Sequence, residues 1–395
     1  MMAATLEALV NKYDLKGQTL GDVALGAVIK HPRDYNLARE CVIDSGLSLR
    51  TPAVDMQRAC GTSIEAAIDI ANKIALGQID SGIAGGTDSI SDAPIVYPDG
   101  YRKVLLSSHR GKSILQKISP WFGLRPSHFK PELPGVAEPR TGLSMGESTE
   151  LTAKAFEVER EHQDQLALAS HMKAAAAYDA GFYSDLVTPY QDVEEDNNIR
   201  RDTTIEKLAR LKPVFDKSED GTMTAGNSTS LTDGAAAVLL TSEEWARQKR
   251  LAVSAYLTHC RVAAVNFISD EGLLMAPAYA VSDMLKHANH NLQDFDFYEI
   301  HEAFAAQTIA TLKAWQSEEF CRNKLGRNAP LGPIDLTKLN IKGGSLAIGH
   351  PFAATGARII ATMAKLLSEK GSGRGLISVC TAGGMGVTAI MEAAA

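Results

Sequence analysis

Apolar and polar positions along the chain follow a pattern that alternates between helical and extended periods. Residues 2–12 carry apolar side chains at helical spacing, and residues 21–30 form an apolar run of strand length. Residues 53–58 look extended, residues 64–77 repeat the helical pattern, and residues 79–86 again resemble a strand. This alternation predicts an α/β domain with a largely parallel sheet.

The regular pattern breaks in the middle of the chain. Residues 102–131 contain seven Lys or Arg residues, no Asp or Glu, and several prolines, which predicts an insertion. Residues 181–220 are polar and rich in loop-forming residues, and regular patterning resumes near Gly226. We therefore expect four segments: an N-terminal α/β half at 1–101, an inserted loop region at 102–220, the end of the N-terminal half at 221–257, and a C-terminal α/β half at 258–395.

The second half repeats the order of elements of the first. Residues 297–301 read as a strand and residues 302–315 as a helix, followed by a glycine-rich loop, a further helix and a last strand. The strand endings SGIAGG at 81–86 and CTAGG at 380–384 resemble each other. This similarity predicts an internal duplication, with two similar domains.

Composition narrows the class of protein. The 395 residues are 45% hydrophobic, which is enough for a large core, and the net charge of -7 gives no general attraction to nucleic acid. Five scattered cysteines without a C-x-x-C pair argue against a disulfide framework or a zinc ribbon. No apolar run of about 18 residues and no secretory signal occurs, so a cytoplasmic location is expected, or a mitochondrial one in a eukaryote.

Cys60 is the first candidate for chemistry. It lies where an extended segment gives way to a helix, and a helix N-terminus favours a thiolate over a thiol. Thr62 and Glu65 have the spacing of a capping box for that helix. The alternative interpretation is that Cys60 is a small buried apolar residue.

Three further residues have positions that suit catalysis. His350 lies at the tip of a glycine-rich loop, Cys380 ends an apolar strand, and His301 follows another strand beside Glu302. A base, a second thiol and an oxyanion donor are the functional interpretations. The alternatives are a solvated histidine, an inert core cysteine and a strand end whose glutamate offsets a helix dipole. Zinc, P-loop, dinucleotide and serine-hydrolase motifs do not occur, so no metal site is expected.

Five motifs together carry a family resemblance. QRACGTS at 57–63, TAGNSTSLTDGAAAVLL at 224–240, HEAFAAQ at 301–307, GGSLAIGHPFAATGAR at 343–358 and CTAGGMG at 380–386 resemble the thiolase superfamily in content and order. This resemblance implies two similar βαβαβαββ halves in a five-layered α-β-α-β-α fold with an inserted loop region.

Within that family, HEAFAAQ in place of N-E-A-F, the EDNNIR run and the basic insertion resemble the thiolase β-subunit of the fatty-acid oxidation trifunctional complex. Two features depart from the family pattern. Ala382 replaces a glycine in the last motif, and the first strand of the family, with its R-T-P-F motif, is not found ahead of Met1. The second departure leads us to expect a truncated start.

The resemblance implies a role for each candidate. Cys60 would be the nucleophile, His350 its base, and Cys380 the acid and base for the leaving and incoming groups. His301 would form an oxyanion hole with His350, and the backbone N-H groups of Cys60 and Ala382 would bind the thioester oxygen.

Substrate contacts and activity follow from the same resemblance. Thr229 matches a position that contacts pantetheine, and Met275 and Phe304 match residues of the substrate channel. The implied activity is degradative 3-ketoacyl-CoA thiolysis, with CoA as co-substrate and no bound cofactor. The alternatives are a biosynthetic acetoacetyl-CoA thiolase and a non-catalytic thiolase-like subunit. A homodimer, a hydratase/dehydrogenase α-subunit as partner, and no nucleic acid are expected.

The basic insertion has an apolar side. Its apolar residues fall on one side of an expected helix whose other side is basic, which suits a membrane surface or a partner protein. A lid over the active site or a solvated loop is the alternative. The apolar residues are Ile114, Leu115, Ile118, Trp121 and Phe122.

Overall fold

The computed structural model describes residues 1–135, 137–269 and 271–394. Within these residues the strands form two four-stranded sheets, with the orders β2-β1-β3-β4 and β5-β8-β7-β6. The first sheet comprises β1 (Asp22–Leu25), β2 (Ala53–Asp55), β3 (Ser81–Asp88) and β4 (Gly234–Thr241). The second comprises β5 (Ala255–Ala264), β6 (Phe297–Ile300), β7 (Arg374–Thr381) and β8 (Met385–Ala393).

The N-terminal sheet is mixed. β1 runs parallel to β2 and β3, and β4 pairs with β3 antiparallel. Nearly every residue of β3 is buried, as is typical of a strand that is covered on both faces. Helices α1 (Met2–Lys12) and α2 (Leu37–Asp44) pack on the outer face. The apolar face of α1, with Leu6 and Val10, is fully buried there.

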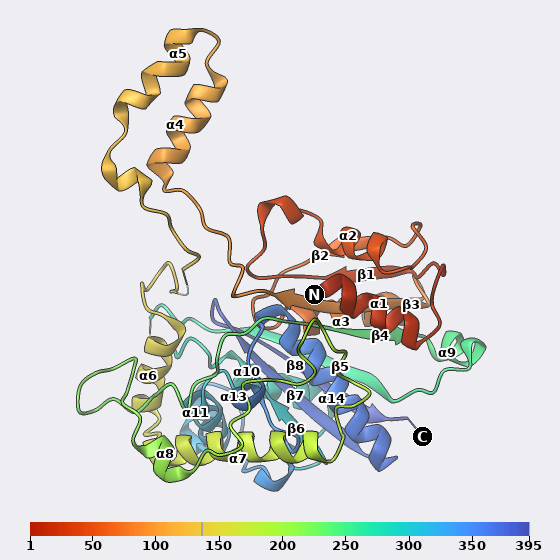
Figure 1. Ribbon diagram of the computed structural model, residues 1–395. Helices are drawn as coiled ribbons and strands as arrows, with labels where there is room; N and C mark the ends of the chain where they lie inside the picture. Colours follow the sequence, from red (N-terminus) through yellow and green to blue (C-terminus); the bar gives the residue numbers. More distant parts are fainter. Residues whose placement is uncertain (136, 270, 395) are drawn as a thin grey trace.

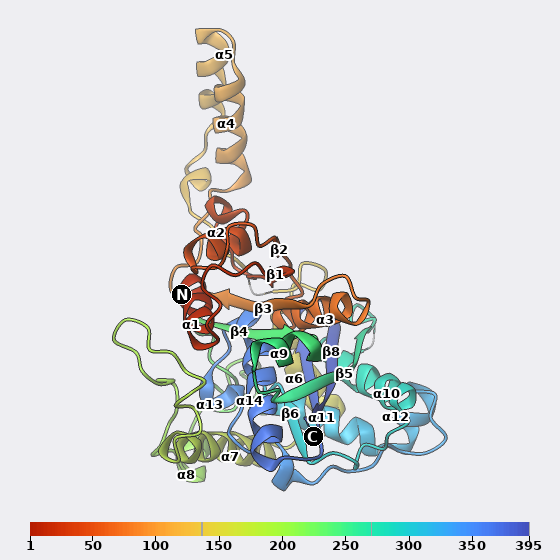
Figure 2. The ribbon, with the colours of Figure 1, turned by 90° about the vertical axis from the view of Figure 1, so that its right-hand side faces the viewer.

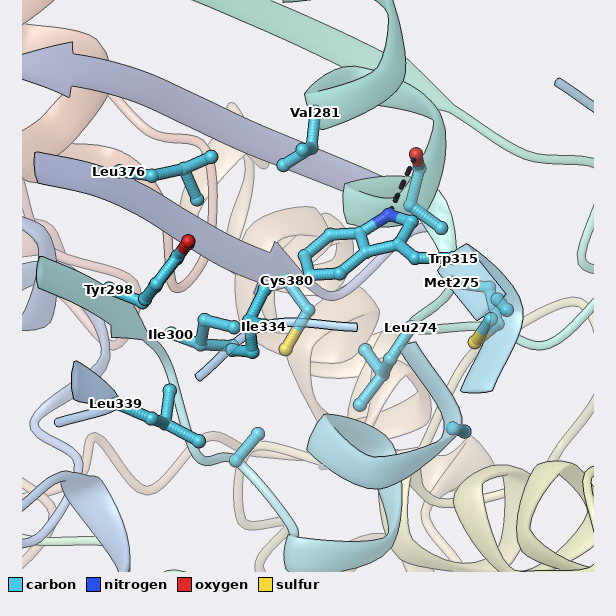
Figure 3. Packing of buried hydrophobic residues seen from close by; sticks show 14 of the residues in the cluster. Leu274, Met275, Val281, Tyr298, Ile300, Trp315, Ile334, Leu339, Leu376 and Cys380 are labelled. Carbon is cyan, nitrogen blue, oxygen red and sulfur yellow. Dashed lines mark hydrogen bonds between the residues drawn. The ribbon is translucent and has the colours of Figure 1, made fainter. Parts of the chain in front are cut away.

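The C-terminal sheet has a related pattern. β6 and β7 are parallel, whereas β7 with β8 and β8 with β5 are antiparallel. Helices α10 (Ala276–Ala288) and α11 (Ala305–Gln316) lie on its outer side and enclose the largest apolar core. Figure 3 shows the indole of Trp315 in this core, with its N-H donating to the carbonyl oxygen of Ala278, together with Cys380.

Two helices form the layer between the sheets. α3 (Thr62–Ala75) contacts β3 and β4, α14 (Thr355–Lys370) contacts β7 and β8, and the two helices pack on each other (Figures 1 and 2). The expected α-β-α-β-α layering is therefore confirmed. Each sheet has four described strands where βαβαβαββ contains five. In the C-terminal half, a single parallel bridge between Tyr298 and Leu339 stands next to β6.

The secondary structure adds detail to two of the expected segments, whose division stays a prediction. The region 102–220 contains three helices besides its loops, namely α6 (Met145–Ala155), the long α7 (Arg160–Asp179) and α8 (Ile205–Ala209). The boundary after residue 257 falls inside β5, whose residues from Ala255 onward pair with β8. β5 therefore belongs wholly to the C-terminal half. The shorter helices α9 (Glu243–Lys249), α12 (Glu318–Asn323) and α13 (Ser345–Ile348) complete the set.

A helical hairpin rises from the N-terminal half. It consists of α4 (Asp99–Arg110), α5 (Ile114–Ile118) and two 3₁₀ turns at Ser119–Gly123 and Pro126–Phe129. The expected single amphipathic helix is wrong, because Pro120 opens a new turn directly after α5. In Figures 1 and 2 the hairpin points away from both sheets, so it does not form the alternative lid.

None of the described helices is both long and apolar enough to span a bilayer.

Candidate active site

The loop that carries Cys60 joins β2 to α3 through a strained turn. Ala59, directly before Cys60, has a left-handed backbone with φ of 44°. The Thr62 hydroxyl holds this turn closed, since it donates to the carbonyl oxygen of Ala59 at 2.7 Å and accepts from the N-H of Arg58 at 2.9 Å. The expected capping box is wrong, because Thr62 lies inside α3 and Glu65 pairs instead with Arg58.

A glycine allows this loop to meet the C-terminal sheet. A Cβ atom on Gly61 would lie 2.9 Å from methyl groups of Thr381 and Val387, a separation too short for a side chain. These two residues belong to β7 and β8. Close approach at Gly61 therefore brings Cys60 to the end of β7, where Cys380 lies.

His350 lies on a buried loop between α13 and α14. The residue is 2% exposed, its backbone N-H donates to Ser230, and its Nδ1 lies 2.7 Å from the Thr355 hydroxyl. Its Nε2 has no hydrogen-bond partner among the described residues. A buried polar atom without a partner in a native site often faces the position of a ligand.

His301 lies beside it at the end of β6. Its backbone N-H donates to the carbonyl oxygen of Ser378 at 2.8 Å, and its Nδ1 lies 2.8 Å from the Ser345 hydroxyl. The rings of His301 and His350 have their centroids 4.2 Å apart. The Nε2 of His301 is also buried without a partner in the described part of the chain. The expected helix start at residue 302 is wrong, since α11 begins at Ala305.

Segments distant in sequence meet at one point. The Sγ of Cys60 and a ring nitrogen of each of His301 and His350 lie within 4.8 Å of one another. A thiol next to two imidazoles can serve as a nucleophile with a base and an oxyanion donor. The same atoms could hold a metal ion, so the expected absence of a metal site stays a prediction.

Cys380 borders the site from β7. It lines, together with His301, a cavity of about 10 Å³, which is about the volume that one water molecule needs. Burial first, and the neighbouring Cys60 thiol second, raise the pKa of the Cys380 thiol. The cavity is lined by Pro277, Ile300, His301, Gln307, Thr308, Thr311, Ser378 and Cys380.

Backbone N-H groups also influence the Cys60 sulfur. Burial is the largest influence on the pKa of Cys60 and raises it, whereas the backbone N-H groups of Ala382 and of Cys60 itself act to lower it. The next residue, Gly383, donates its N-H to the buried carboxylate of Glu138 at 2.6 Å. Glu138 therefore fixes the loop that supplies the Ala382 donor. A backbone donor does not depend on the side chain, so alanine in place of glycine leaves it intact.

Burial determines the protonation states of Cys60 and His350. Desolvation raises the pKa of Cys60 to about 12, although the residue keeps partial solvent access. Burial first, and the Arg358 charge second, lower the pKa of His350 to about 3. Both shifts favour a neutral thiol and a neutral imidazole at neutral pH. The expected thiolate is therefore wrong for the resting site, because desolvation outweighs the helix dipole and the backbone donors.

The residues expected to bind the substrate lie close by. The hydroxyl of Thr229 donates to the carbonyl oxygen of Ser345 at 2.6 Å, so the position contacts the catalytic loop. Met275 and Phe304 are buried in the same apolar cluster as Cys380 (Figure 3 labels Met275). Their contacts with a substrate stay predictions.

Several supporting residues were not found from the sequence. Ser345, Thr355 and Arg358 lie inside the glycine-rich motif, but only the fold shows which histidine each one serves. Glu302, by contrast, is buried and accepts from Ser170, Asn340 and the N-H of Leu346, which fixes the catalytic loop. Glu138 gave no signal in the sequence.

Comparison with known proteins agrees with this geometry. The family model described as "Thiolase, N-terminal domain" matches residues 1–244, and "Thiolase, C-terminal domain" matches residues 251–393. A 3-ketoacyl-CoA thiolase of Pectobacterium atrosepticum is 44% identical over 94% of this chain and 85% of its own length. One from Yersinia pestis is 41% identical over 97% of this chain and 89% of its own length.

Solved structures give the same result. Human mitochondrial 3-ketoacyl-CoA thiolase superposes with a TM-score of 0.81 at 28% identity, covering 100% of this chain and 92% of that one. The Bacillus anthracis acetyl-CoA acetyltransferase superposes with a TM-score of 0.80 at 30% identity, covering 99% and 91%. The chain belongs to the thiolase family.

Proposed function

We propose that this protein is a degradative 3-ketoacyl-CoA thiolase, an acyltransferase that cleaves 3-ketoacyl-CoA with CoA. The observation that carries the proposal is the convergence of the Cys60 sulfur with the two imidazoles of His301 and His350 within 4.8 Å. The relatives that bear this name match the chain over nearly its whole length. CoA is a co-substrate in this reaction, as fits a similar human enzyme solved in complex with CoA.

The first step forms an acyl-enzyme. As the Cys60 sulfur attacks the ketone carbon, its proton passes to Nε2 of His350, which is buried and unpartnered. The bond between the α-carbon and the ketone carbon then breaks, and its electron pair becomes the enolate of acetyl-CoA. Since the resting pair is neutral, proton transfer accompanies the attack.

Two sets of donors stabilise the charges that develop. His301 and the protonated His350 face the enolate oxygen with their Nε2 atoms, in a buried setting where hydrogen bonds to charge are strong. The N-H groups of Cys60 and Ala382 bind the oxygen of the acyl group in the tetrahedral steps.

Cys380 completes the proton balance. Its thiol protonates the enolate carbon, so that acetyl-CoA leaves and Cys380 becomes a thiolate. This thiolate then takes the proton of incoming CoA, whose sulfur attacks the acyl group on Cys60. The Cys60 thiolate that leaves recovers its proton from His350.

Thiolysis assays with short and long 3-ketoacyl-CoA substrates test the proposal. We expect CoA-dependent cleavage that extends to long chains. Turnover confined to acetoacetyl-CoA would support the biosynthetic alternative. Complete lack of cleavage by a folded protein would favour the non-catalytic alternative and contradict the proposal.

The hairpin supports a further part of the proposal, contact with an anionic membrane surface. Phe122 is 86% exposed and Leu115 81%, which is unusual for large apolar side chains in such a group. Seven Lys or Arg residues and no acidic residue occur in the segment 102–131, so the charge complements anionic lipid.

Assembly is proposed in the same way. A homodimer would cover the open edge of β2, which is an outer strand of its sheet close to the nucleophile loop. The hydratase/dehydrogenase α-subunit and the cytoplasmic or mitochondrial location stay predictions from the family resemblance.

A further inference from the structure

His301 and His350 differ in the hydrogen bonds that support their rings. Each imidazole contacts a hydroxyl through Nδ1, His301 at Ser345 and His350 at Thr355, at 2.8 and 2.7 Å respectively. Only the Ser345 hydroxyl has a second partner, the guanidinium of Arg358, whose Nη2 lies 3.0 Å from it. The environments of two neighbouring rings are therefore chemically different.

The arginine determines the direction of the hydrogen bond to His301. A guanidinium only donates, so the Ser345 oxygen must accept from Arg358. Within the described residues, the Ser345 hydroxyl has His301 Nδ1 as its one acceptor. The arrangement that satisfies every group has Ser345 donating to Nδ1. The proton of the neutral imidazole then lies on Nε2, the atom that faces the site.

We propose that Arg358 and Ser345 lock His301 in the tautomer that is protonated at Nε2. Both are positioning residues, because they act through His301, and His301 can then only donate a hydrogen bond to the substrate oxygen. The inference rests on the proposed thiolase function, in which this oxygen is that of the enolate.

At His350, by contrast, the direction of the hydrogen bond to Nδ1 is not fixed. The Thr355 hydroxyl makes no hydrogen bond except that to His350 in the described part of the chain, so it can either donate to Nδ1 or accept from it. The ring can therefore lose and gain its Nε2 proton without losing its support. A base must be able to take up and release a proton at Nε2. A hydrogen-bond donor must keep that proton, as His301 does.

One helical turn supplies both supports. Thr355 and Arg358 are three residues apart in the first turn of α14, so their side chains lie on the same face of the helix. The Nε and Nη1 atoms of Arg358 are buried without a described partner. Such a guanidinium costs stability relative to an apolar side chain, which is consistent with a functional reason for its place.

Two reactions, thiolysis and CoA exchange, distinguish an effect of Ser345 on the His301 tautomer from a general loss of structure. Thiolysis forms the enolate that His301 binds. Exchange of labelled CoA into acetyl-CoA passes through the Cys60 acyl-enzyme but forms no enolate. The Ser345→Ala variant should lower kcat for thiolysis on the order of 100-fold, which is the effect of losing one oxyanion donor. Its KM and its rate of CoA exchange should stay within about 3-fold of those of the unaltered protein.

Matched variants sharpen the test. Ser345→Thr keeps the hydroxyl and should retain most of the thiolysis rate. Ser282→Ala is the control, since Ser282 is a buried serine that accepts from Arg327, and it should leave both reactions unchanged. Arg358→Gln introduces an acceptor beside Ser345 and should also slow thiolysis selectively. Equal slowing of both reactions in Ser345→Ala would overturn the proposal, and so would normal thiolysis in Ser345→Ala or in Arg358→Gln.

The tautomer can also be observed in the unaltered protein. Nitrogen-15 NMR of histidine-labelled enzyme, with the His301 signals assigned by their loss in His301→Asn, should show Nε2 protonated and Nδ1 bare. A proton on Nδ1 would overturn the inference. If the unaltered protein lacks both thiolysis and CoA exchange, the proposed function fails instead, and that outcome is distinct from a selective effect of Ser345.

Discussion

The catalytic centre and the α4–α5 hairpin are built on opposite principles. The centre is assembled from distant segments, and its two histidines are each 2% exposed. The hairpin is one continuous segment whose aromatic residues pack mainly on one another, as in the contacts of Tyr101 with Trp121 and Phe129. It leaves large apolar side chains in solvent. Among the described residues, the centre has buried polar atoms without a partner, whereas the hairpin has exposed apolar side chains.

This contrast means that the two regions should respond independently to substitution. No hydrogen bond or ion pair in the described residues joins the segment 99–130 to the catalytic side chains. The link along the chain is Glu138, which follows the hairpin and supports the loop of Ala382. Substitutions at the tip of the hairpin should therefore leave the chemistry intact.

The largest expected effect that separates the regions concerns vesicle binding. Burying a large apolar side chain contributes about 1.5–3 kcal/mol, so replacing both Leu115 and Phe122 by serine should weaken binding to anionic vesicles roughly 100-fold or more. Co-sedimentation with such vesicles measures the binding, and a thiolysis assay measures kcat, which should not change.

A control variant makes that comparison specific. Leu336 is 60% exposed but lies outside the hairpin, so Leu336→Ser should not alter vesicle binding. Equal pelleting of the hairpin variant and the unaltered protein would remove the membrane proposal. A large fall in kcat in the hairpin variant would break the separation of the two regions.

A smaller effect is expected inside the centre, at Thr229. Its hydroxyl donates to the carbonyl oxygen of Ser345, so it is placed beside the loop of His350 without belonging to the reacting groups. Thr229→Val should raise KM for CoA substrates by a few-fold, about 1 kcal/mol for a lost hydrogen bond, with less change in kcat. Steady-state kinetics measure both constants, and an unchanged KM would reject the contact.

Much of this organisation was accessible from the sequence. The motifs around Cys60, His301, His350 and Cys380 predicted their convergence, and the alternating pattern predicted two α/β halves. These features follow from local periodicity and from motifs that keep their order along the chain. The layered fold was confirmed, whereas the long helices within 102–220 were missed because their surroundings are polar and irregular.

The remaining properties arise only when the chain is folded. The sequence predicted a lowered pKa for Cys60, whereas burial raises it. The extent of this desolvation depends on what packs around the sulfur, which the sequence does not show. The contact of Ser345 with His301 joins residues 44 positions apart, so no spacing along the chain indicates it. The break of the hairpin helix at Pro120, by contrast, could have been predicted, since proline rarely continues a helix.

The central claim is that Cys60 carries the acyl group. Intact-protein mass spectrometry after incubation with a 3-ketoacyl-CoA, in the absence of free CoA, tests it most directly. The unaltered protein should gain the mass of one acyl group, and the Cys60→Ala variant should gain none, since the attacking sulfur is gone. A persistent acyl adduct on a folded Cys60→Ala protein would contradict the account.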